Sequence, residues 1–548
     1  MAHEAIRAEL ARVAALLGAP DSVAVELETP RDPAHGDVAT NLALLLARHL
    51  KAPPRALAER IVAALRLPPE LVSSVEVAGP GFINFRFATG QLGRLLADIL
   101  AAGSDYGRSR SATPLRINVE FVSANPTGPL HVAHGRGAAL GDCVASLLEW
   151  QGHSVSREFY VNDAGAQVER LGESVWARLQ QQLGREAAIP EQGYHGGYVA
   201  ELASQLIAER GAAVGDLPPA QGVALCRDFA VAAMKREQRR DLEDFRVRFE
   251  VWFEESRLHS EQRIGRTLAE LERRGMLFEE GGALWLRTTA FGDDKDRVLR
   301  KSDGSFTYFT PDIAYHEDKA RRGFDRAIDV WGADHHGYVP RMRAAMMALG
   351  HGEDFFEALI VQLVTVVRHG EEVKMSKRAG TFVTLRDLMD EVGVDAARYF
   401  FLMRRADTPF AFDIDLALKR TEENPVFYVQ MAHARMSGIF RVGAVDPKLV
   451  TAEGVDIAAL REPVETELLK QLARFPETLR RAADALEPQR VTAYLEDLAR
   501  VAHNWYHHCR VLGEAPEVER ARLALARATQ IVLANGLRVL GLGAPERM

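Results

Sequence analysis

The sequence predicts a multidomain α/β protein in which a mostly parallel sheet lies between an N-terminal α+β domain and a C-terminal all-α helical bundle. Three observations lead to this prediction. At 548 residues the chain is too long for a single hydrophobic core. From Leu115 onward strands alternate with helices, which indicates crossovers between parallel strands. After about residue 422 only helical periodicity remains.

The N-terminal domain is predicted to cover residues 1–110. Apolar residues recur there at helical spacing in three segments, and one segment alternates as a strand after a Gly-Pro-Gly turn. These segments are Glu4–Leu17, Ala39–Leu50, Ala56–Leu65 and Phe82–Phe87. Gly103–Thr113 is polar and rich in Gly and Ser, so we expect it to be the linker that ends the domain.

Residues 111–380 are predicted to form the α/β domain, with a helical insertion at about 190–275. Before the insertion we expect strand, helix, strand and helix at Leu115–Val122, Gly135–Trp150, Ser156–Val161 and Ala164–Leu183. After it we expect short strands at Leu284–Leu286 and Phe306–Phe309, strands at Arg326–Trp331 and Ala358–Val367, and a helix at Tyr338–Leu349. Residues 381–421 are predicted to be connecting helices, which lead into the bundle at 422–548.

Composition limits the function classes. The three cysteines form no CxxC pair, which argues against a structural zinc site and suits a reducing compartment. The charged N-terminal segment is not typical of a signal peptide, and no apolar run is long enough for a membrane span, so a cytoplasmic protein is expected. No domain is net basic, so a nucleic acid would have to bind local patches of positive charge.

Chemistry is concentrated first in Asn118–Asp142, where an apolar strand, a loop and a small-residue helix follow one another. A helix start presents unpaired backbone N–H groups, which makes it an anion site. His131 and His134 lie three residues apart at this helix start and can face one ligand. A zinc site would need a third ligand, so no metal is expected from protein side chains alone. Without the preceding loop, two surface histidines would be the simpler interpretation.

The second candidate is the Gly-bounded segment Gly370–Thr381, which follows a predicted buried strand. It contains Lys374, Lys377 and Arg378. Ammonium groups on a loop can close over a polyphosphate and neutralise the charge that develops as it leaves. A solvated basic loop is the alternative, and the segment alone does not decide between the two.

Together the motifs HVAH and KMSKR resemble the HIGH and KMSKS signatures of class I aminoacyl-tRNA synthetases. Further segments narrow the resemblance to the arginyl-tRNA synthetase family. These segments are VEFVSANPTGPLHVAHGRGAALGD, VWGADHHGYVPRM, KMSKRAG, NGLRVLGLGAPERM, ETPRDPAHGDVATNLALLLA and GPGFINFRF. The sequence departs from the signatures at Ala133, where HIGH has glycine, and at Arg378, where KMSKS has its final serine. Neither change removes a catalytic group, so we expect altered nucleotide affinity with activity kept.

The resemblance implies a Rossmann-like catalytic domain that activates L-arginine with ATP and Mg²⁺ and transfers the arginyl group to tRNA(Arg). Positioning and charge stabilisation would carry the first step. The catalytic groups implied are His131, His134, Lys374 and Lys377. The ATP contacts implied are Asn125, Pro126, Thr127, Gly128, Gly135, Met375 and Ser376.

Arginine is a planar, permanent cation, so its pocket needs carboxylates. The family pattern supplies Glu120 and Asp312 for this purpose, and Asn125 for the α-amino or α-carboxylate group. Tyr308 and one of Asp334, His335 and His336 complete the implied pocket.

The C-terminal helices resemble the family's anticodon-binding domain, in which Trp505 and Tyr506 could stack on bases. The N-terminal domain would contact the tRNA elbow. The resemblance also implies a monomer that needs tRNA for arginine activation. The interval between the signatures leaves no room for an editing domain.

Three alternative functions can be weighed against the sequence. A related ligase for another amino acid would need a larger insertion or a zinc site. A non-catalytic RNA-binding paralogue would be expected to lack His131, His134 or Lys377, and all three are present. A nucleotidyltransferase for a small molecule would not need some 130 helical residues after the lysine loop.

Overall fold

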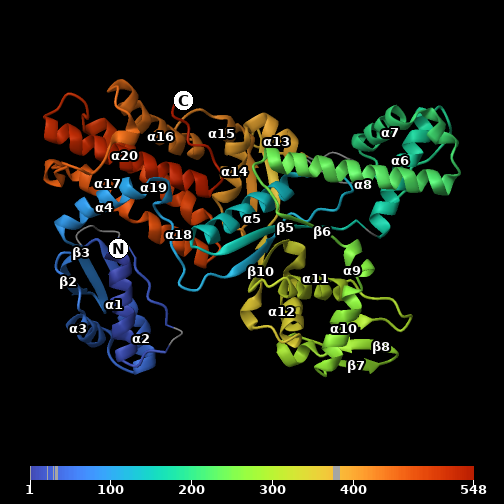
Figure 1. Ribbon diagram of the computed structural model, residues 1–548, viewed down its shortest axis with the longest axis horizontal. Helices are drawn as coiled ribbons and strands as arrows, with labels where there is room; N and C mark the ends of the chain where they lie inside the picture. The colour runs from blue at the N-terminus through green and yellow to red at the C-terminus, as the bar shows by residue number, and fades with distance from the viewer. Residues whose placement is uncertain (1, 21–22, 29, 31–34, 164, 374–382) are drawn as a thin grey trace.

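The structure, a computed structural model, describes residues 2–20, 23–28, 30, 35–163, 165–373 and 383–548. The residues predicted for the second signature therefore lie outside the described residues; they are Lys374, Met375, Ser376, Lys377 and Arg378. A five-stranded sheet forms the centre of the molecule, with the N-terminal unit and the C-terminal helices on one side and the insertion helices on the other (Figure 1).

The central sheet is parallel throughout, with the strand order β11-β10-β4-β5-β6. Its strands are β4 (Arg116–Glu120), β5 (Ser154–Val161), β6 (Val251–Glu254), β10 (Arg326–Gly332) and β11 (Phe356–Val361). Helix α5 (Val132–Trp150) connects β4 to its parallel neighbour β5. Ile117 and Asn118 of β4 face opposite sides of the sheet and are both fully buried, as expected for the middle strand of a sheet covered on both faces. The predicted parallel, Rossmann-like fold is confirmed.

The predicted helical insertion contains a strand that the sequence pattern did not indicate. Helices α6 (Ala166–Gln182), α7 (Gly197–Arg210) and α8 (Pro219–Asp244) share a small core of their own. The chain then returns to the central sheet as β6, whose four residues pair with β5. A strand of four residues inside a helical stretch is too short for alternation to reveal it.

Two further predictions on strands were wrong. The stretch Ala358–Val367 is not one strand, because the chain leaves β11 at Gln362 and starts β12 (Val364–Arg368) in a different sheet. The Gln362 carbonyl accepts a hydrogen bond of 3.0 Å from the buried guanidinium of Arg136, which fixes this bend. The stretch Phe306–Phe309 is not a strand either, since helix α11 (Phe309–Arg321) begins there.

Two three-stranded sheets flank the central sheet. One pairs β12 with β13 (Glu371–Glu372) and β14 (Phe410–Asp413). The other is antiparallel and consists of β7 (Leu277–Glu280), β8 (Ala283–Leu286) and β9 (Arg297–Arg300). Short helices complete this region: α9 (Ser256–Ser260), α10 (Arg263–Arg273), α12 (Val339–Ala348), α13 (Leu385–Val392), α14 (Val394–Leu402) and α15 (Ile414–Leu418).

The N-terminal unit has a hydrophobic core of its own, which includes Leu10, Leu46 and Phe85. Its elements are α1 (Ala2–Leu16), β1 (Val38–Thr40), α2 (Leu42–Leu50), α3 (Pro54–Ala64), β2 (Val72–Ala78) and β3 (Phe82–Phe87). The next helix, α4 (Thr89–Ala102), packs into the main core instead. The predicted linker is packed in its first part, because Tyr106 is buried and its hydroxyl donates to the Leu472 carbonyl at 3.4 Å.

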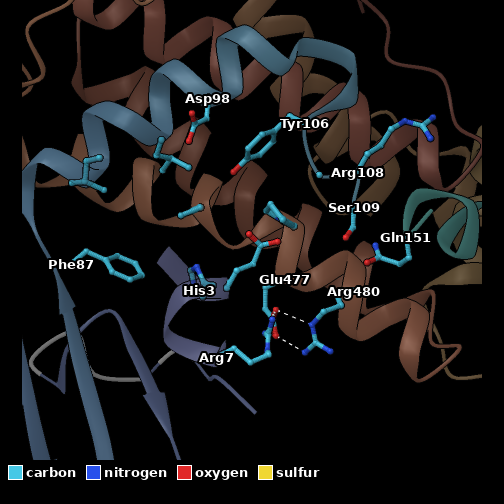
Figure 2. A pocket seen from close by; sticks show the side chains of 16 residues that line it. His3, Arg7, Phe87, Asp98, Tyr106, Arg108, Ser109, Gln151, Glu477 and Arg480 are labelled. Carbon is cyan, nitrogen blue, oxygen red and sulfur yellow. Dashed lines mark hydrogen bonds and ion pairs between the residues drawn. The ribbon is translucent and has the colours of Figure 1, made fainter. Parts of the chain in front are cut away.

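A cavity of about 140 Å³ with both polar and apolar walls lies between the N-terminal unit and the C-terminal helices (Figure 2). On its floor the Glu477 carboxylate accepts from both Arg7 of α1 and Arg480. Burial lowers the pKa of His3 in the same wall to about 4, so this imidazole is neutral at physiological pH. A further ion pair joins Lys470 to Asp37 at 2.5 Å. The N-terminal unit is therefore attached largely through charged contacts.

The C-terminal helices form the predicted bundle. They are α16 (Pro425–Val442), α17 (Pro463–Ala473), α18 (Phe475–Asp484), α19 (Gln489–His508) and α20 (Pro516–Val539). In the described part of the chain, no helix has the length and apolar character that crossing a membrane would require.

Candidate active site

The first signature begins where β4 ends, in a turn with an unusual backbone. Val122 and Ser123 have φ angles of 68° and 40°, a left-handed conformation that L-residues seldom adopt. The Ser123 hydroxyl donates to Glu120 Oε1 at 2.8 Å and accepts from the backbone N–H of Tyr160 at 3.1 Å. Such strain, of about 1–3 kcal/mol per residue, persists where neighbouring contacts impose the geometry.

The loop after this turn is held from the insertion helices. Gln238 of α8 is almost fully buried and donates to the carbonyls of Asn125 and Gly128, both at 3.0 Å. Tyr198 of α7 donates to the Thr127 carbonyl at 2.8 Å. Sequence reasoning missed both residues, because nothing in the chain marks a helix of the insertion as a partner of a loop some 110 residues earlier.

The two histidines meet at the start of α5. The backbone N–H of His131 donates to His134 Nδ1 at 3.2 Å, and the two rings stack with centroids 3.7 Å apart. Since Nδ1 of His134 accepts here, the proton of its neutral ring resides on Nε2. The pair therefore forms one unit at a helix N-terminus, where backbone dipoles favour an anion.

The chain that follows the second signature returns to this helix start. The Leu385 N–H donates to the Leu130 carbonyl at 2.8 Å, and the Val132 N–H donates to the Val383 carbonyl at 3.3 Å. Thr384 forms a bridge with His131 and caps α13 by accepting from the Asp387 N–H at 2.9 Å. Although residues 374–382 are not described, their C-terminal flank is therefore fixed beside the histidine pair.

Gly135 is required by packing inside the protein. A Cβ at this position would lie 2.7 Å from the Leu385 side chain and 3.1 Å from that of Phe401. The close approach of α13 and α14 therefore explains why position 135 is a glycine, whereas the sequence analysis had assigned this glycine to the approach of a nucleotide. Ala133, two residues before Gly135 in α5, is partly exposed.

Asp312 lies in the first turn of α11 and is half-buried. Burial raises the pKa of its carboxyl group above the usual range, although Tyr338 opposes the shift by donating from its hydroxyl to Oδ2 at 2.5 Å. His335 is near enough to lower the pKa of the same carboxyl group. A half-buried carboxylate of this kind is suited to a cationic ligand. Tyr338 was not predicted, because the pattern pointed to its neighbours.

Glu120, at the end of β4, is buried and already has a cationic partner. The fully buried ammonium of Lys319 donates to Glu120 Oε2 at 2.6 Å and to Asp329 Oδ1 at 2.8 Å. His316 Nε2 lies 2.7 Å from Asp329 Oδ2. Among the described residues, Glu120, His316 and Asp329 are the one group with the spacing of metal ligands, and the Lys319 ammonium already bonds to both of its carboxylates.

Several predicted contacts are at the surface. The Tyr308 side chain precedes α11 and is 93% exposed, so it does not line the pocket around Asp312. Asp334, His335 and His336 follow β10 in a short 3-10 helix (Ala333–Tyr338) and are all exposed. His335 lies 3.2 Å from Asp334, and its ring is 5.8 Å from Trp331. Of these three, His335 is the one that acts on Asp312.

The two predicted tRNA contacts on α19 differ in position. Trp505 is fully buried in the bundle, so its assignment as a base-stacking residue was wrong. Its neighbour Tyr506 is 40% exposed and borders a groove of about 890 Å³. Four arginines line this groove: Arg435, Arg441, Arg510 and Arg547. The guanidinium of Arg435 lies 5.7 Å from the centre of the Tyr506 ring.

Comparison with known proteins covers the whole chain. The family models "Arginyl tRNA synthetase N terminal domain", "tRNA synthetases class I (R), catalytic domain" and "DALR anticodon binding domain" match residues 1–87, 95–407 and 429–548. An arginine–tRNA ligase of Geobacillus kaustophilus is 48% identical over 549 residues, covering 99% of this chain and 97% of the relative. One of Desulforudis audaxviator is 50% identical over 528 residues, covering 95% and 93%.

The fold agrees with these relatives. The solved Thermus thermophilus arginyl-tRNA synthetase superposes with a TM-score of 0.80 and 23% identity, covering all of both chains. The three matched ranges correspond to the N-terminal unit, the region around the central sheet and the C-terminal bundle. The range matched by the catalytic model contains both signatures. The chain belongs to the arginyl-tRNA synthetase family of class I tRNA synthetases.

Proposed function

We propose that this protein is an arginine–tRNA ligase, which joins L-arginine to tRNA(Arg) through an arginyl-adenylate and releases AMP and pyrophosphate. The observation that carries the proposal is that the chain directly after the second signature returns to the helix start that holds the first signature. The flank Val383–Leu385 is hydrogen-bonded to the backbone beside His131 and His134. Phosphate groups bound by the helix start would therefore lie within reach of the lysine loop.

In the activation step the arginine carboxylate attacks the α-phosphate of ATP, and pyrophosphate leaves. His131 and His134 would donate to phosphate oxygens as charge grows on them, because preorganised donors stabilise the transition state more than the ground state. Lys374 and Lys377 would neutralise the pyrophosphate side. The remaining ATP contacts proposed are Asn125, Pro126, Thr127, Gly128, Met375 and Ser376. Mg²⁺ would arrive with ATP as its counter-ion.

For arginine, we assign Asp312 as the principal contact of the guanidinium group. Its carboxylate is half-buried and accepts from Tyr338 through Oδ2, so Oδ1 can serve the substrate. Glu120 would supply the second carboxylate, and Asn125 the contact to the α-amino or α-carboxylate group. His335 is favoured over Asp334 and His336 as the further polar contact, because it acts on Asp312.

For tRNA, we propose that the bundle at 422–548 binds the anticodon and that residues 1–110 contact the elbow. The groove beside Tyr506 combines an exposed aromatic ring with four arginines, which suits an unpaired base and its phosphates. We also propose that the enzyme is a cytoplasmic monomer and that it activates arginine only when tRNA is bound.

The test is arginylation of a tRNA(Arg) transcript by the purified protein. We expect charging with arginine and ATP, and a loss of at least about a hundredfold in His134→Ala, given the magnitude of transition-state charge stabilisation. His195→Ala is the matched control, because His195 is exposed before α7 and belongs to none of the proposed binding sites. Absence of charging by the wild-type protein would reject the proposal, and equal charging by both variants would reject the role of His134.

A further inference from the structure

A row of acidic residues crosses the centre of the parallel sheet. In the strand register, Asp329 of β10 is paired with Glu120 of β4, and Glu120 is paired with Glu158 of β5. Glu158 and Asp329 are fully buried, and Glu120 nearly so. Residues paired in register point to the same face of a sheet, where adjacent like charges repel each other. Such a row requires cations opposite it.

Helix α11 and the residue that follows it supply two cations, one for each part of the row. Arg322 donates to both oxygens of Glu158, at 2.6 and 2.8 Å, and Tyr315 also donates to Glu158 at 2.8 Å. Lys319 bridges Glu120 and Asp329, as described above. Lys319 and Arg322 thus oppose the three carboxylates of the row, which leaves negative charge on this face of the sheet. Asp312, also on α11, adds to this negative charge.

We propose that Lys319 is a positioning residue of the arginine pocket, which holds the Glu120 carboxylate in the orientation that receives the guanidinium group. The inference rests on the proposed role of Glu120 as an arginine contact. Lys319 does not touch the substrate. It acts through Glu120, which it holds from inside the protein while Ser123 holds the other oxygen.

The geometry of Glu120 supports this role. Each carboxylate oxygen can accept about two hydrogen bonds, and Glu120 accepts one at Oε2 from Lys319 and one at Oε1 from Ser123. Both oxygens therefore keep acceptor capacity while the carboxylate is fixed at both ends. A planar guanidinium engages two oxygens in a defined plane, so it is sensitive to the rotation of a carboxylate. A compact cation would be less sensitive.

The groups around Glu120 act in opposite directions on its pKa. Burial alone would lower the pKa of Lys319, but Asp329 and Glu120 outweigh it and raise the pKa. Burial raises the pKa of Glu120, and Lys319 opposes this rise. The other groups that act on Glu120 are Asp329, from β10, and His316, from α11, while Tyr160 and Tyr315 are in turn influenced by its charge.

The test compares Lys319→Met with the matched control Arg322→Met, measuring thermal stability and the KM values for arginine and ATP in tRNA charging. Both substitutions remove a cation from the acidic row, but only Lys319 contacts Glu120. For K319M we expect the arginine KM to rise at least about tenfold and the ATP KM to stay within about twofold. For R322M both KM values should stay within about twofold, whatever the loss of stability.

A pH profile gives a signature that a purely structural role would not produce. Without the ammonium, Glu120 faces Asp329 directly, so its pKa should rise further. The kcat/KM for arginine of K319M should then fall more steeply than that of the wild type between about pH 8 and about pH 6.

If K319M does not fold, Lys319→Met combined with Asp329→Asn replaces it, because this double variant keeps the wild-type net charge of the cluster. An arginine KM raised at least about tenfold in the double variant supports positioning. A wild-type value there, or in folded K319M, overturns it and leaves Lys319 as a neutralising residue. Glu120→Gln is measured in parallel: an unchanged arginine KM in E120Q would reject the assignment of Glu120 itself.

Discussion

Replacing Asp312 by asparagine tests the arginine pocket with the smallest change in shape. The carboxyl group is half-buried at the first turn of α11, and Tyr338 donates to its Oδ2 at 2.5 Å. An asparagine carbonyl oxygen can still accept from Tyr338, so D312N removes the charge and leaves the packing in place. Any change in substrate use should then come from the lost interaction with the guanidinium group.

The magnitude follows from the kind of contact that is lost. A hydrogen bond to a charged group contributes about 1.5–3 kcal/mol. Since about 1.4 kcal/mol corresponds to a factor of ten, kcat/KM for arginine should fall by about tenfold to about 150-fold. The assay is steady-state charging of tRNA(Arg), with arginine varied at saturating ATP and then ATP varied at saturating arginine. The KM for ATP should remain near the wild-type value.

D312N should not lower the free energy of unfolding, although it lowers kcat/KM for arginine. The folded-state pKa of Asp312 is raised by burial, so its protonated form favours the fold; this contribution is present at acid pH and lost as pH rises through the folded-state pKa. At neutral pH the ionised group therefore lowers the free energy of unfolding. D312N should be as stable as the wild type or more stable. An unchanged kcat/KM for arginine in a folded D312N would refute the assignment of Asp312 to the pocket.

Three further predictions concern other parts of the molecule. Trp505→Ala should lower the free energy of unfolding by about 3–5 kcal/mol, because the ring is fully buried. Tyr506→Ala should raise the KM for tRNA with little effect on unfolding. Denaturant titration and charging assays measure the two effects, and the reverse pattern would contradict the placement of α19. Gly135→Ala should lower the free energy of unfolding by about 1–3 kcal/mol, because the added Cβ would meet Leu385 and Phe401. A wild-type melting temperature of this variant would show that α13 can shift. Combining Asp37→Asn with Glu477→Gln should make the N-terminal unit more sensitive to limited proteolysis and raise the KM for tRNA; unchanged cleavage would show that charged contacts do not attach this unit.

Long, regular elements could be predicted from the sequence because their periodicity is local. Phe82–Phe87 is a strand with the predicted bounds, and β4, α5 and β5 lie where apolar periodicity placed a strand, a helix and a strand. β6 could not be predicted, because its four residues are strand-like only through pairing with β5. The division of Ala358–Val367 likewise depends on Arg136, a residue more than 200 positions away.

The site could be predicted only in its local parts. The spacing of His131 and His134 places both at a helix start, and their contact follows from it. The partners of Glu120 could not be inferred, because Lys319 and Asp329 reach it only after α11 covers β4 and β10. Exposure also depends on tertiary packing: Tyr308 and Asp312 are four residues apart on the same chain segment, yet one is almost fully exposed and the other is half-buried.

Arginine-dependent exchange of pyrophosphate into ATP tests the central claim most directly, because it isolates the step in which both signatures act. The measurement compares reactions with arginine and without it, each in the presence and in the absence of tRNA(Arg). We predict exchange only when arginine and tRNA are both present. Equal exchange without tRNA would refute the predicted tRNA dependence alone. No arginine-dependent exchange under either condition would contradict the assignment of this site to arginine activation.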